Sequence, residues 1–181
     1  NKYAMIFWAA AENKTQVIDA LNSKNEMPGV EPHYAINLPE KSMTVIDYDK
    51  AISSVESRDA FYKYEEFEVS GSFSKTVELK RPFAQLNIGT LTYKSDMTPN
   101  DVEVKSTVIT VKSPADCFDV ATGKGSTTAA ADAVFEADGV VTDPATFRVK
   151  DPVTSVETDY HYLSMNYLLV AADKAIVDVE F

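Results

Sequence analysis

Cysteine and histidine are scarce in this chain of 181 residues. It has one cysteine, Cys117, and two histidines, His33 and His161, which lie far apart in the sequence. One cysteine cannot form an intrachain disulfide or build a cysteine-based metal site. Two distant histidines leave little for a histidine-rich metal site or an acid–base centre. We therefore expect a protein that is not an enzyme and needs no cofactor, and we nominate no catalytic, cofactor-binding or metal-ligating residues.

Positive charge and long apolar runs are also lacking. The chain has 17 lysines and arginines against 28 aspartates and glutamates, a formal net charge of −11. Nucleic acids and anionic lipid surfaces both require clustered cations, so neither is an expected partner. No apolar run reaches the length of about 18 residues that a membrane-spanning helix needs. The apolar residues of segment 1–11 lack the cleavage context of a secretory signal, and we expect a buried strand there.

What the sequence does contain is the pattern of a folded β protein. Hydrophobic residues make up 45% and charged residues 25%, which is ordinary for a globular domain. Apolar residues recur at every second position in many segments, the period of a half-buried strand. The predicted strands are residues 3–9, 43–47, 67–79, 84–88, 108–111, 147–149, 160–170 and 175–181. Since strands do not alternate regularly with helices, the pattern predicts an all-β, antiparallel sandwich or barrel.

Helical structure is expected in only a few places. Residues 13–22 predict a short helix, and residues 58–62 predict a helical turn that brings Phe61 and Tyr62 to the core. Residues 23–32, which include two prolines and a glycine, predict a loop. Residues 113–128 predict a loop with a short helical turn, and the alanine-rich residues 129–136 are ambiguous.

The apolar phase changes around Pro82. Apolar positions are odd-numbered up to Leu79 and even-numbered from Ala84 onward. A change of phase indicates either one inserted residue, as in a β-bulge, or a break in the strand. Two interpretations of Lys80 and Arg81 stay open: their charges protect a sheet edge, or they pair with a carboxylate across the sheet.

Short motifs that suggest chemistry fail on spacing or context. The Gly123–Thr127 stretch lacks the glycine spacing of a phosphate-binding loop, and we interpret it as a surface loop. Ser72 and Lys75 match a serine–lysine motif that works only on a helix, but the surroundings predict a strand. Asp47 and Asp49 lack the further ligands of a calcium loop.

Other candidate residues have ordinary structural explanations. Asn13 begins a glycosylation sequon, which is a pattern that often occurs by chance. Cys117 has no histidine near it in sequence, and we expect a small buried or half-buried thiol. A set of aromatic residues could line a sugar-binding platform but is interpreted as core: Phe7, Trp8, Tyr160, Tyr162 and Tyr167.

Both ends of the chain carry strand patterns. Residues 3–9 and residues 175–181 each run to within a few residues of an end. We therefore expect a fragment, with sequence missing before Asn1 and after Phe181.

One segment resembles a known family. Residues 79–90, Leu-Lys-Arg-Pro-Phe-Ala-Gln-Leu-Asn-Ile-Gly-Thr, resemble a signature of the fimbrillin-like proteins of Bacteroidetes, the subunits of type V pili and related surface lipoproteins. Residues 6–9, 58–62 and 162–169 are similar in type and order to other parts of that family. The stretch from Arg81 to Asn87 is the most specific of these similarities.

The resemblance implies a fold and an assembly. It implies a transthyretin-like antiparallel β-sandwich of about seven strands with short helical turns, in which residues 1–181 are one domain, the N-terminal domain of a two-domain subunit. It implies a lipoprotein at the cell surface, held on the outer membrane by an N-terminal lipid anchor outside this sequence, or located in the fimbrium. In pilus-forming members an arginine-specific protease removes the first strand, although Arg58, Arg81 and Arg148 all have other interpretations here.

We therefore predict a structural or adhesive subunit of a fimbria, assembled by strand donation between pilin subunits. The acceptor groove is expected along residues 3–9 and 84–90. The alternative is a stand-alone, outer-membrane-anchored surface protein that binds glycans or host proteins through loops such as 23–40 or 113–128.

Overall fold

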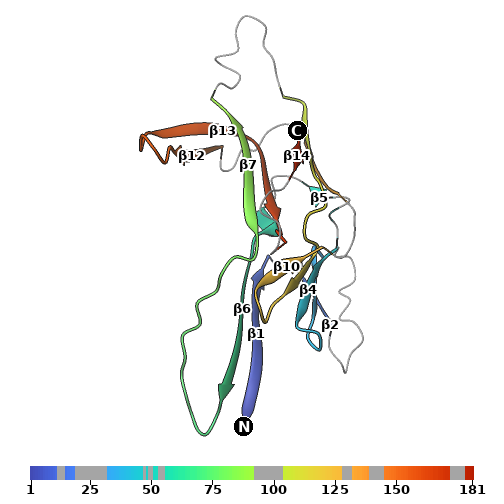
Figure 1. The fold of residues 1–181 in the computed structure, drawn as a ribbon, viewed down its shortest axis with the longest axis vertical. Coiled ribbons are helices and arrows are strands. Elements are labelled where there is room, and N and C mark those ends of the chain that lie inside the picture. The colour runs from blue at the N-terminus through green and yellow to red at the C-terminus, as the bar shows by residue number, and fades with distance from the viewer. Residues whose placement is uncertain are drawn as a thin grey trace, which may run out of the picture.

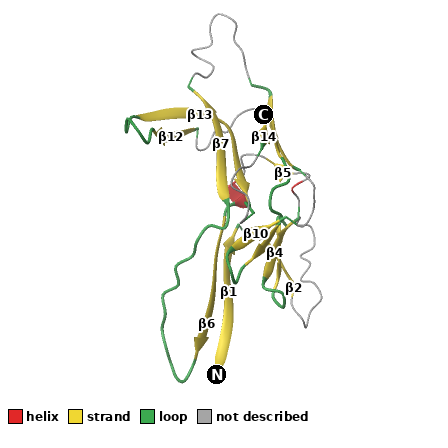
Figure 2. Cartoon of the chain, viewed as in Figure 1, coloured by secondary structure: helices red, strands yellow, loops and turns green. Residues whose placement is uncertain are grey.

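The fold is known from a computed structural model, which describes residues 1–11, 15–18, 32–46, 48, 51–52, 56–91, 104–127, 132–138, 145–171 and 178–181. Within these residues regular structure is almost all β-strand (Figure 2). A short 3-10 turn, η2 (Glu56–Arg58), precedes one of the long strands. The all-β class predicted from the alternating apolar pattern is confirmed.

The described strands form four sheets. A two-stranded ribbon pairs β1 (Lys2–Ala10) with β6 (Ala60–Glu68). A five-stranded sheet has the order β10 (Lys124–Ser126), β9 (Cys117–Asp119), β4 (Ser42–Val45), β3 (Tyr34–Asn37) and β2 (Thr15–Ile18). A four-stranded sheet has the order β14 (Val179–Glu180), β8 (Ser106–Val111), β11 (Ala133–Asp138) and β5 (Ala51–Ile52). A three-stranded sheet has the order β12 (Thr146–Lys150), β13 (Glu157–Leu168) and β7 (Ala84–Thr90).

Most pairings are antiparallel, as a sandwich built of hairpins requires. The exceptions are β2 with β3 and β5 with β11, which are parallel. The described residues form more strands than the about seven expected, because several strands are only two to four residues long.

One hydrophobic cluster joins the sheets. Its largest fully buried side chains come from the five-stranded sheet (Tyr34, Met43), the four-stranded sheet (Ile109, Phe135) and β13 (Met165). The C-terminal half of β13 is buried on both faces, since every residue from Ser164 to Leu168 is buried. A strand that lies between two packed layers loses the simple alternation of a half-buried strand.

Two elements extend away from this core (Figure 1). The β1–β6 ribbon runs to one end of the molecule, and residues 69–83, here called the return segment, run back beside it toward β7. The β12–β13 hairpin projects sideways near the other end. Both projections leave strand surface and strand edges outside the packed core.

Several predicted strands are confirmed. Strands β1, β7, β8 and β12 cover the predicted segments 3–9, 84–88, 108–111 and 147–149 in full. Strand β4 ends at Val45, within the predicted segment 43–47, and β13 ends at Leu168, within the predicted segment 160–170. Only the last part of segment 175–181 lies in the described residues, where β14 forms. The break predicted at Lys80–Pro82 lies between strands, but the preceding strand ends much earlier than predicted, since β6 stops at Glu68 and β7 begins at Ala84.

Other local predictions were wrong. Residues 15–18 of the expected helix 13–22 form strand β2, because Thr15–Ile18 pair in register with Tyr34–Asn37. The expected helical turn at 58–62 lies earlier, at η2, and Phe61 and Tyr62 belong to strand β6. In both places tertiary pairing overrides a weak local propensity.

Two further segments differ from expectation. The strand pattern expected to continue to residue 79 stops at Glu68, and Phe73 and Leu79 are exposed. The loop expected at 113–128 contains the β9–β10 hairpin. Residues 23–31, most of the loop expected at 23–32, lie outside the described residues.

Candidate functional site

The β1–β6 ribbon has a register that decides which backbone groups face outward. Backbone nitrogen and oxygen atoms of Asn1 and Val69 exchange hydrogen bonds of 3.0 and 2.9 Å, and the next opposed pairs are Lys2 with Glu68 and Tyr3 with Phe67. In an antiparallel ladder hydrogen-bonded and non-hydrogen-bonded pairs alternate. Tyr3 and Met5 therefore bond to β6, whereas the backbone groups of Lys2, Ala4 and Ile6 face away from it.

The two edges of the ribbon differ. On the β6 side, Tyr62 exchanges backbone hydrogen bonds of 2.8 and 2.9 Å with Lys80 of the return segment. On the β1 side, no strand of the described residues pairs with β1 beyond β6. Strand β7 also lies at an edge of its sheet, since its one strand partner in the described residues is β13. The two strands expected to line a groove thus belong to different sheets, and among the described strands each is paired on one side only.

The inner half of the ribbon is attached to the core. Ile6, Trp8, Ala10 and Tyr62 pack against the buried cluster, and the Trp8 and Tyr34 rings meet edge to face with centroids 5.6 Å apart. The Tyr34 hydroxyl donates a hydrogen bond to the carbonyl of Arg58. The ribbon is therefore held firmly at one end, and its outer half projects.

Three aromatic rings meet at the outer end of the ribbon, and we call them the tip cluster: the exposed Tyr3 and Phe73 and the half-buried Phe67. The ring centroids of Tyr3 and Phe67 are 6.2 Å apart with planes inclined at 29°, and those of Phe67 and Phe73 are 5.4 Å apart. Tyr3 is 46% exposed and Phe73 is 57% exposed, and the neighbouring Met5 is 46% exposed. Exposed aromatic rings gathered on one projection are typical of a binding surface.

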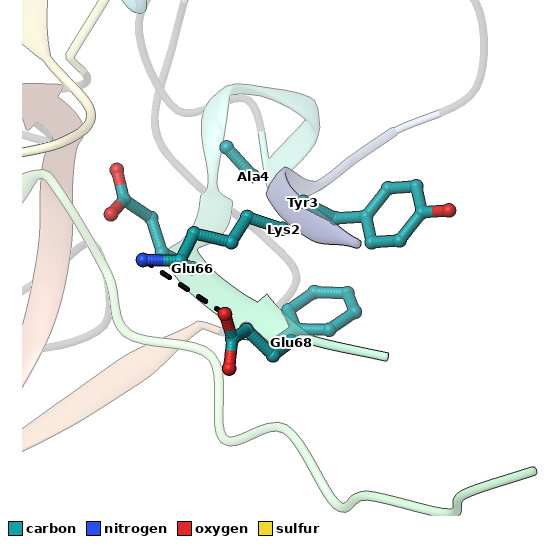
Figure 3. A pocket seen from close by; sticks show the side chains of 6 residues that line it. Lys2, Tyr3, Ala4, Glu66 and Glu68 are labelled. Atoms are coloured by element: carbon teal, nitrogen blue, oxygen red, sulfur yellow. Dashed lines mark ion pairs between the residues drawn. The ribbon is translucent and has the colours of Figure 1, made fainter. Parts of the chain in front are cut away.

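A hollow of about 560 Å³ lies across the same end of the ribbon, lined by Lys2, Tyr3, Ala4, Glu66, Phe67 and Glu68. Figure 3 shows Lys2, Glu66 and Glu68 reaching to one side of the strands while the Tyr3 ring reaches to the other. The Lys2 ammonium lies 3.9 Å from a Glu68 carboxylate oxygen. The small side chain of Ala4 leaves the space open between the charged groups. The two carboxylates and the ammonium group therefore share one face of the ribbon, and the Tyr3 and Phe67 rings lie on the opposite face.

The return segment is fixed to the body by Arg81. Its guanidinium donates to both carboxylate oxygens of Asp59, with Nη2 2.7 Å from Oδ2 and Nε 3.1 Å from Oδ1, and it lies 5.1 Å from the centroid of the Phe61 ring. The hydrogen bond to Asp59 raises the pKa of Arg81. The interpretation of a cation that pairs with a carboxylate is correct for Arg81.

Next to this ion pair, the Tyr167 hydroxyl links β13 to the turn before β6. It donates to a Glu56 carboxylate oxygen at 3.0 Å and accepts from Gln85 Nε2 at 3.3 Å. Burial, followed by the hydrogen bond to Glu56, raises the pKa of Tyr167. These contacts position strands rather than reactive groups.

A smaller hollow of about 120 Å³ lies where the ribbon meets the β9–β10 turn. Tyr62, Tyr64 and Lys80 line it together with residues 120–123. Gly123 has a φ of +71°, and a Cβ atom there would lie 2.5 Å from the Tyr62 hydroxyl. Glycine at this turn therefore lets the ribbon pack against the five-stranded sheet.

The motif residues considered in the sequence fall in structural places. The Gly123–Thr127 stretch follows a turn that Asp119 closes. The Oδ1 atom of Asp119 accepts the backbone N–H groups of Thr122 and Ala121 at 3.0 and 2.8 Å. These hydrogen bonds lower the pKa of Asp119. Lys75 of the serine–lysine motif pairs with Glu65 at 2.6 Å, in an irregular segment. Cys117 is a half-buried free thiol on β9.

The remaining candidate residues form no reactive cluster in the described part of the chain. Asp47, Asp49 and Asn13 lie outside the described residues. His33 is buried, and Ser57 Oγ lies 3.5 Å from its Nε2. The described part of the chain holds no group of three or more histidine, cysteine, aspartate or glutamate side chains placed to bind a metal ion. Nor does any helix in it have the length and apolar character needed to cross a membrane.

The aromatic residues divide between core and surface. Tyr162 and Tyr167 are buried, as the core interpretation predicted, and Phe7, Trp8 and Tyr160 are half-buried. The tip cluster was missed, because Tyr3 and Phe67 lie far apart in sequence and meet only through the register of β1 and β6. The one sequence signal was the shared odd phase of Phe67 and Phe73.

Comparisons with known proteins identify the family and little else. No curated protein matches the chain, and no solved structure matches it. The model of a family described as a family of unknown function (DUF6562) matches residues 1–181. Because that match covers the whole chain, this protein belongs to the DUF6562 family.

Proposed function

We propose that this protein is a structural or adhesive subunit of a cell-surface fimbria, joined to other pilin subunits by β-strand addition along β1. The observation that carries the proposal is the open edge of β1. This strand is nine residues long, its Lys2, Ala4 and Ile6 backbone groups face away from β6, and it pairs with no second strand in the described residues.

The physics of the joint follows from that edge. An unpaired strand edge is a template for another chain, and an added strand gains backbone hydrogen bonds along its length. Apolar side chains on the face of the added strand that turns toward the hydrophobic core would become buried. Each fully buried large side chain stabilises the joint by about 1.5–3 kcal/mol. Several such side chains give a long-lived joint without any reaction of the acceptor chain.

The remaining parts of the proposal come from the resemblance of residues 79–90 to fimbrillin-like proteins. They are a second domain, an N-terminal lipid anchor on the outer membrane, a location at the cell surface or in the fimbrium, and a role without catalysis. Host or bacterial surface ligands are further proposed partners. The ion pair of Arg81 with Asp59 supports the view that this segment has an architectural role.

The test is assembly of the full-length precursor. We expect the precursor treated with an arginine-specific protease to form a ladder of polymers on a gel run without boiling. Ala4→Pro removes an outward-facing N–H and leaves the bonds of Tyr3 and Met5 to β6 in place, so it should shorten or abolish the ladder. Ala4→Ser keeps the N–H and is the matched control.

Two outcomes would contradict the proposal. One is a precursor that stays monomeric after cleavage. The other is a ladder that Ala4→Pro leaves unchanged, which would place the joint elsewhere. The first outcome would favour a stand-alone surface protein that binds glycans or host proteins, the role that the exposed rings of the tip cluster support.

A further inference from the structure

We infer that the strand added to β1 is β12 of a second copy of this chain. The β1–β6 ribbon of one copy and the β12–β13 hairpin of the next would then form one continuous sheet. The inference rests on the proposed strand addition along β1 and names the strand that is added.

Strand β12 has the position and the length that this joint needs. It lies at the edge of the three-stranded sheet, and β13 is its one strand partner in the described residues. Its five residues match the outer half of β1, from Lys2 to Ile6. The hairpin and the ribbon project from the core near opposite ends of the molecule (Figure 1). Both edges therefore lie on projections, outside the packed core.

The hydrogen bonds of β12 show which of its backbone groups face outward. The Tyr162 amide donates to the Ala145 carbonyl at 3.1 Å, and the Asp151 amide donates to the Val156 carbonyl at 2.9 Å. These two pairs lie on either side of β12, whose register with β13 is unbroken between them. Because bonded and non-bonded pairs alternate, the even-numbered residues of β12 face away from β13: Thr146, Arg148 and Lys150.

The apolar faces of the two edges coincide in an antiparallel joint. Outward-facing groups of β1 would bond to those of β12, and directly opposed side chains point to the same side of a sheet. With Ala4 opposite Arg148, every residue of β12 has a partner on β1. The odd-numbered side chains then form two apolar pairs on one face: Tyr3 with Val149, and Met5 with Phe147. Since the first three of these side chains are 46%, 44% and 46% exposed, the joint covers apolar surface that is otherwise in water.

Charge complementarity favours the joint on the other face. Ala4 is paired on β6 with Glu66, and its small side chain leaves the hollow of about 560 Å³ open beside the Glu66 carboxylate. Neighbouring strands lie about 4.8 Å apart, so an arginine opposite Ala4 can extend across it toward Glu66. The Arg148 guanidinium would then lie between carboxylates of two copies, because it already bonds to Asp159 of its own hairpin at 2.7 Å.

A pair of lysines opposes the joint in this register. Lys2 comes to lie opposite Lys150, and opposed like charges destabilise a strand pair. Each ammonium nevertheless has a carboxylate on its other side, since Glu68 is paired with Lys2 and Glu157 is paired with Lys150. Both lysines are exposed, so solvent and salt screen the repulsion.

Other pairings of open edges are less favourable. Two β12 strands would bring two rows of cations together, and two β1 strands would leave the hollow beside Ala4 unfilled. Strand β7, which is also paired on one side only among the described strands, has no charged residue to offer the hollow. The joint of β1 with β12 is heterologous, so each copy keeps one free edge and the contact can repeat into an open chain.

The test is a mixed disulfide between two single-cysteine variants, both of which also carry Cys117→Ser to remove the native thiol. Tyr3→Cys would be mixed with Val149→Cys and oxidised with glutathione disulfide. The two positions form a non-hydrogen-bonded pair with Cα atoms about 4.5 Å apart, a separation that a disulfide spans. We expect a dimer of chains linked at these two positions, identified by mass spectrometry of the linked peptides.

A geometric control separates the joint from random collision. Lys150→Cys introduces a thiol next to position 149 but on the opposite face of β12. It should form little mixed disulfide with Tyr3→Cys. Tyr3, Val149 and Lys150 are exposed, so thermal unfolding should show that all three variants remain folded.

A charge control tests the other face. Glu66→Lys, added to the Tyr3→Cys chain, should lower the yield of mixed disulfide several-fold, because Arg148 would meet a like charge. The Glu66 side chain is 69% exposed, so this change should not disturb folding. Glu136→Lys makes the same change of charge at an exposed position on β11 and should leave the yield unchanged.

Three results would overturn the inference: no mixed disulfide of Tyr3→Cys with Val149→Cys, an equal yield with Lys150→Cys, or a yield that Glu66→Lys leaves unchanged. The ladder assay distinguishes this failure from failure of the proposed function. A ladder that Ala4→Pro abolishes, without a mixed disulfide, would keep strand addition along β1 and reject β12 as the added strand. A mixed disulfide without a ladder would keep the joint and reject the fimbria.

Discussion

At the scale of single residues, close approaches decide which side chains the fold accepts. Gly125 on β10 forms a bridge with Ala171 after β13, and a Cβ atom at Gly125 would lie 2.4 Å from the Val170 carbonyl oxygen. Backbone atoms cannot move aside as a flexible side chain can. Gly71, in contrast, has no atom near its hypothetical Cβ position. The two glycines therefore have different reasons to be present.

The residue-scale prediction compares these two glycines. Gly125→Ala should lower the free energy of unfolding by about 1–3 kcal/mol, the usual cost of overpacking, since β10 must move away from residue 170. Gly71→Ala should have no cost, or stabilise slightly by reducing the freedom of the unfolded chain. Urea denaturation of both variants and the parent measures this. Equal stability of Gly125→Ala and the parent would show that a methyl group fits between Gly125 and the Val170 carbonyl oxygen without cost.

At the scale of elements, the ribbon and the return segment act as one unit. The return segment touches the ribbon at three kinds of contact: the Phe73 ring on Phe67, the Lys75–Glu65 ion pair and the backbone bridge of Lys80 with Tyr62. Arg81 then ties its end to Asp59. These contacts explain how a segment without strand structure stays beside the ribbon and presents Phe73 at its tip.

The element-scale prediction concerns the Arg81 ion pair. Arg81→Ala should lower the free energy of unfolding by no more than about 1 kcal/mol, because the guanidinium is half exposed and solvent screens the pair. The exchange rates of the Lys80 and Tyr62 amides should nevertheless rise by more than this small loss of global stability would produce. Arg148→Ala, which breaks a similar bidentate pair with Asp159 on the β12–β13 hairpin, is the control and should leave those two amides unaffected. Unchanged exchange in Arg81→Ala would mean that the bridge is held by its other contacts.

At the scale of the whole molecule, stability should fall from the core toward the tip of the ribbon. β13 is buried on both faces where it crosses the cluster, whereas the outer half of β1 is exposed and pairs on one side only. Local opening costs little where few apolar contacts are made and approaches the global cost in the core. A projection of this kind is free to meet a ligand or another subunit without disturbing the core.

The whole-molecule prediction is a pattern of amide exchange. Amides of Met165–Leu168 should exchange slowest, and those of the outer half of β1 fastest among the strands. Within β1 the pattern should alternate, with Tyr3 and Met5 protected by β6 and Lys2 and Ala4 exposed at the open edge. Exchange measured by NMR on the monomeric chain would show this. Uniform protection along β1 would mean that its outer edge is already covered in solution.

Sequence patterns predicted those strands whose apolar alternation is regular. Met43 and Val45 of β4, for example, are both buried as their spacing predicts. The segments whose structure was predicted wrongly are those that depend on a pairing partner distant in sequence. Thr15–Ile18 became a strand because β3 lies beside it, and no local feature of residues 13–22 reports that neighbour. The tip cluster depended in the same way on the opposition of Tyr3 and Phe67.

The chain alone was enough to establish an all-β protein with an acidic composition, because side-chain alternation and charge are local or additive properties. Which strand edges stay open, which rings meet at the tip and which carboxylate Arg81 binds were settled only in three dimensions. Each depends on the register between strands distant in sequence, and a slip of one residue would turn every side chain to the opposite face.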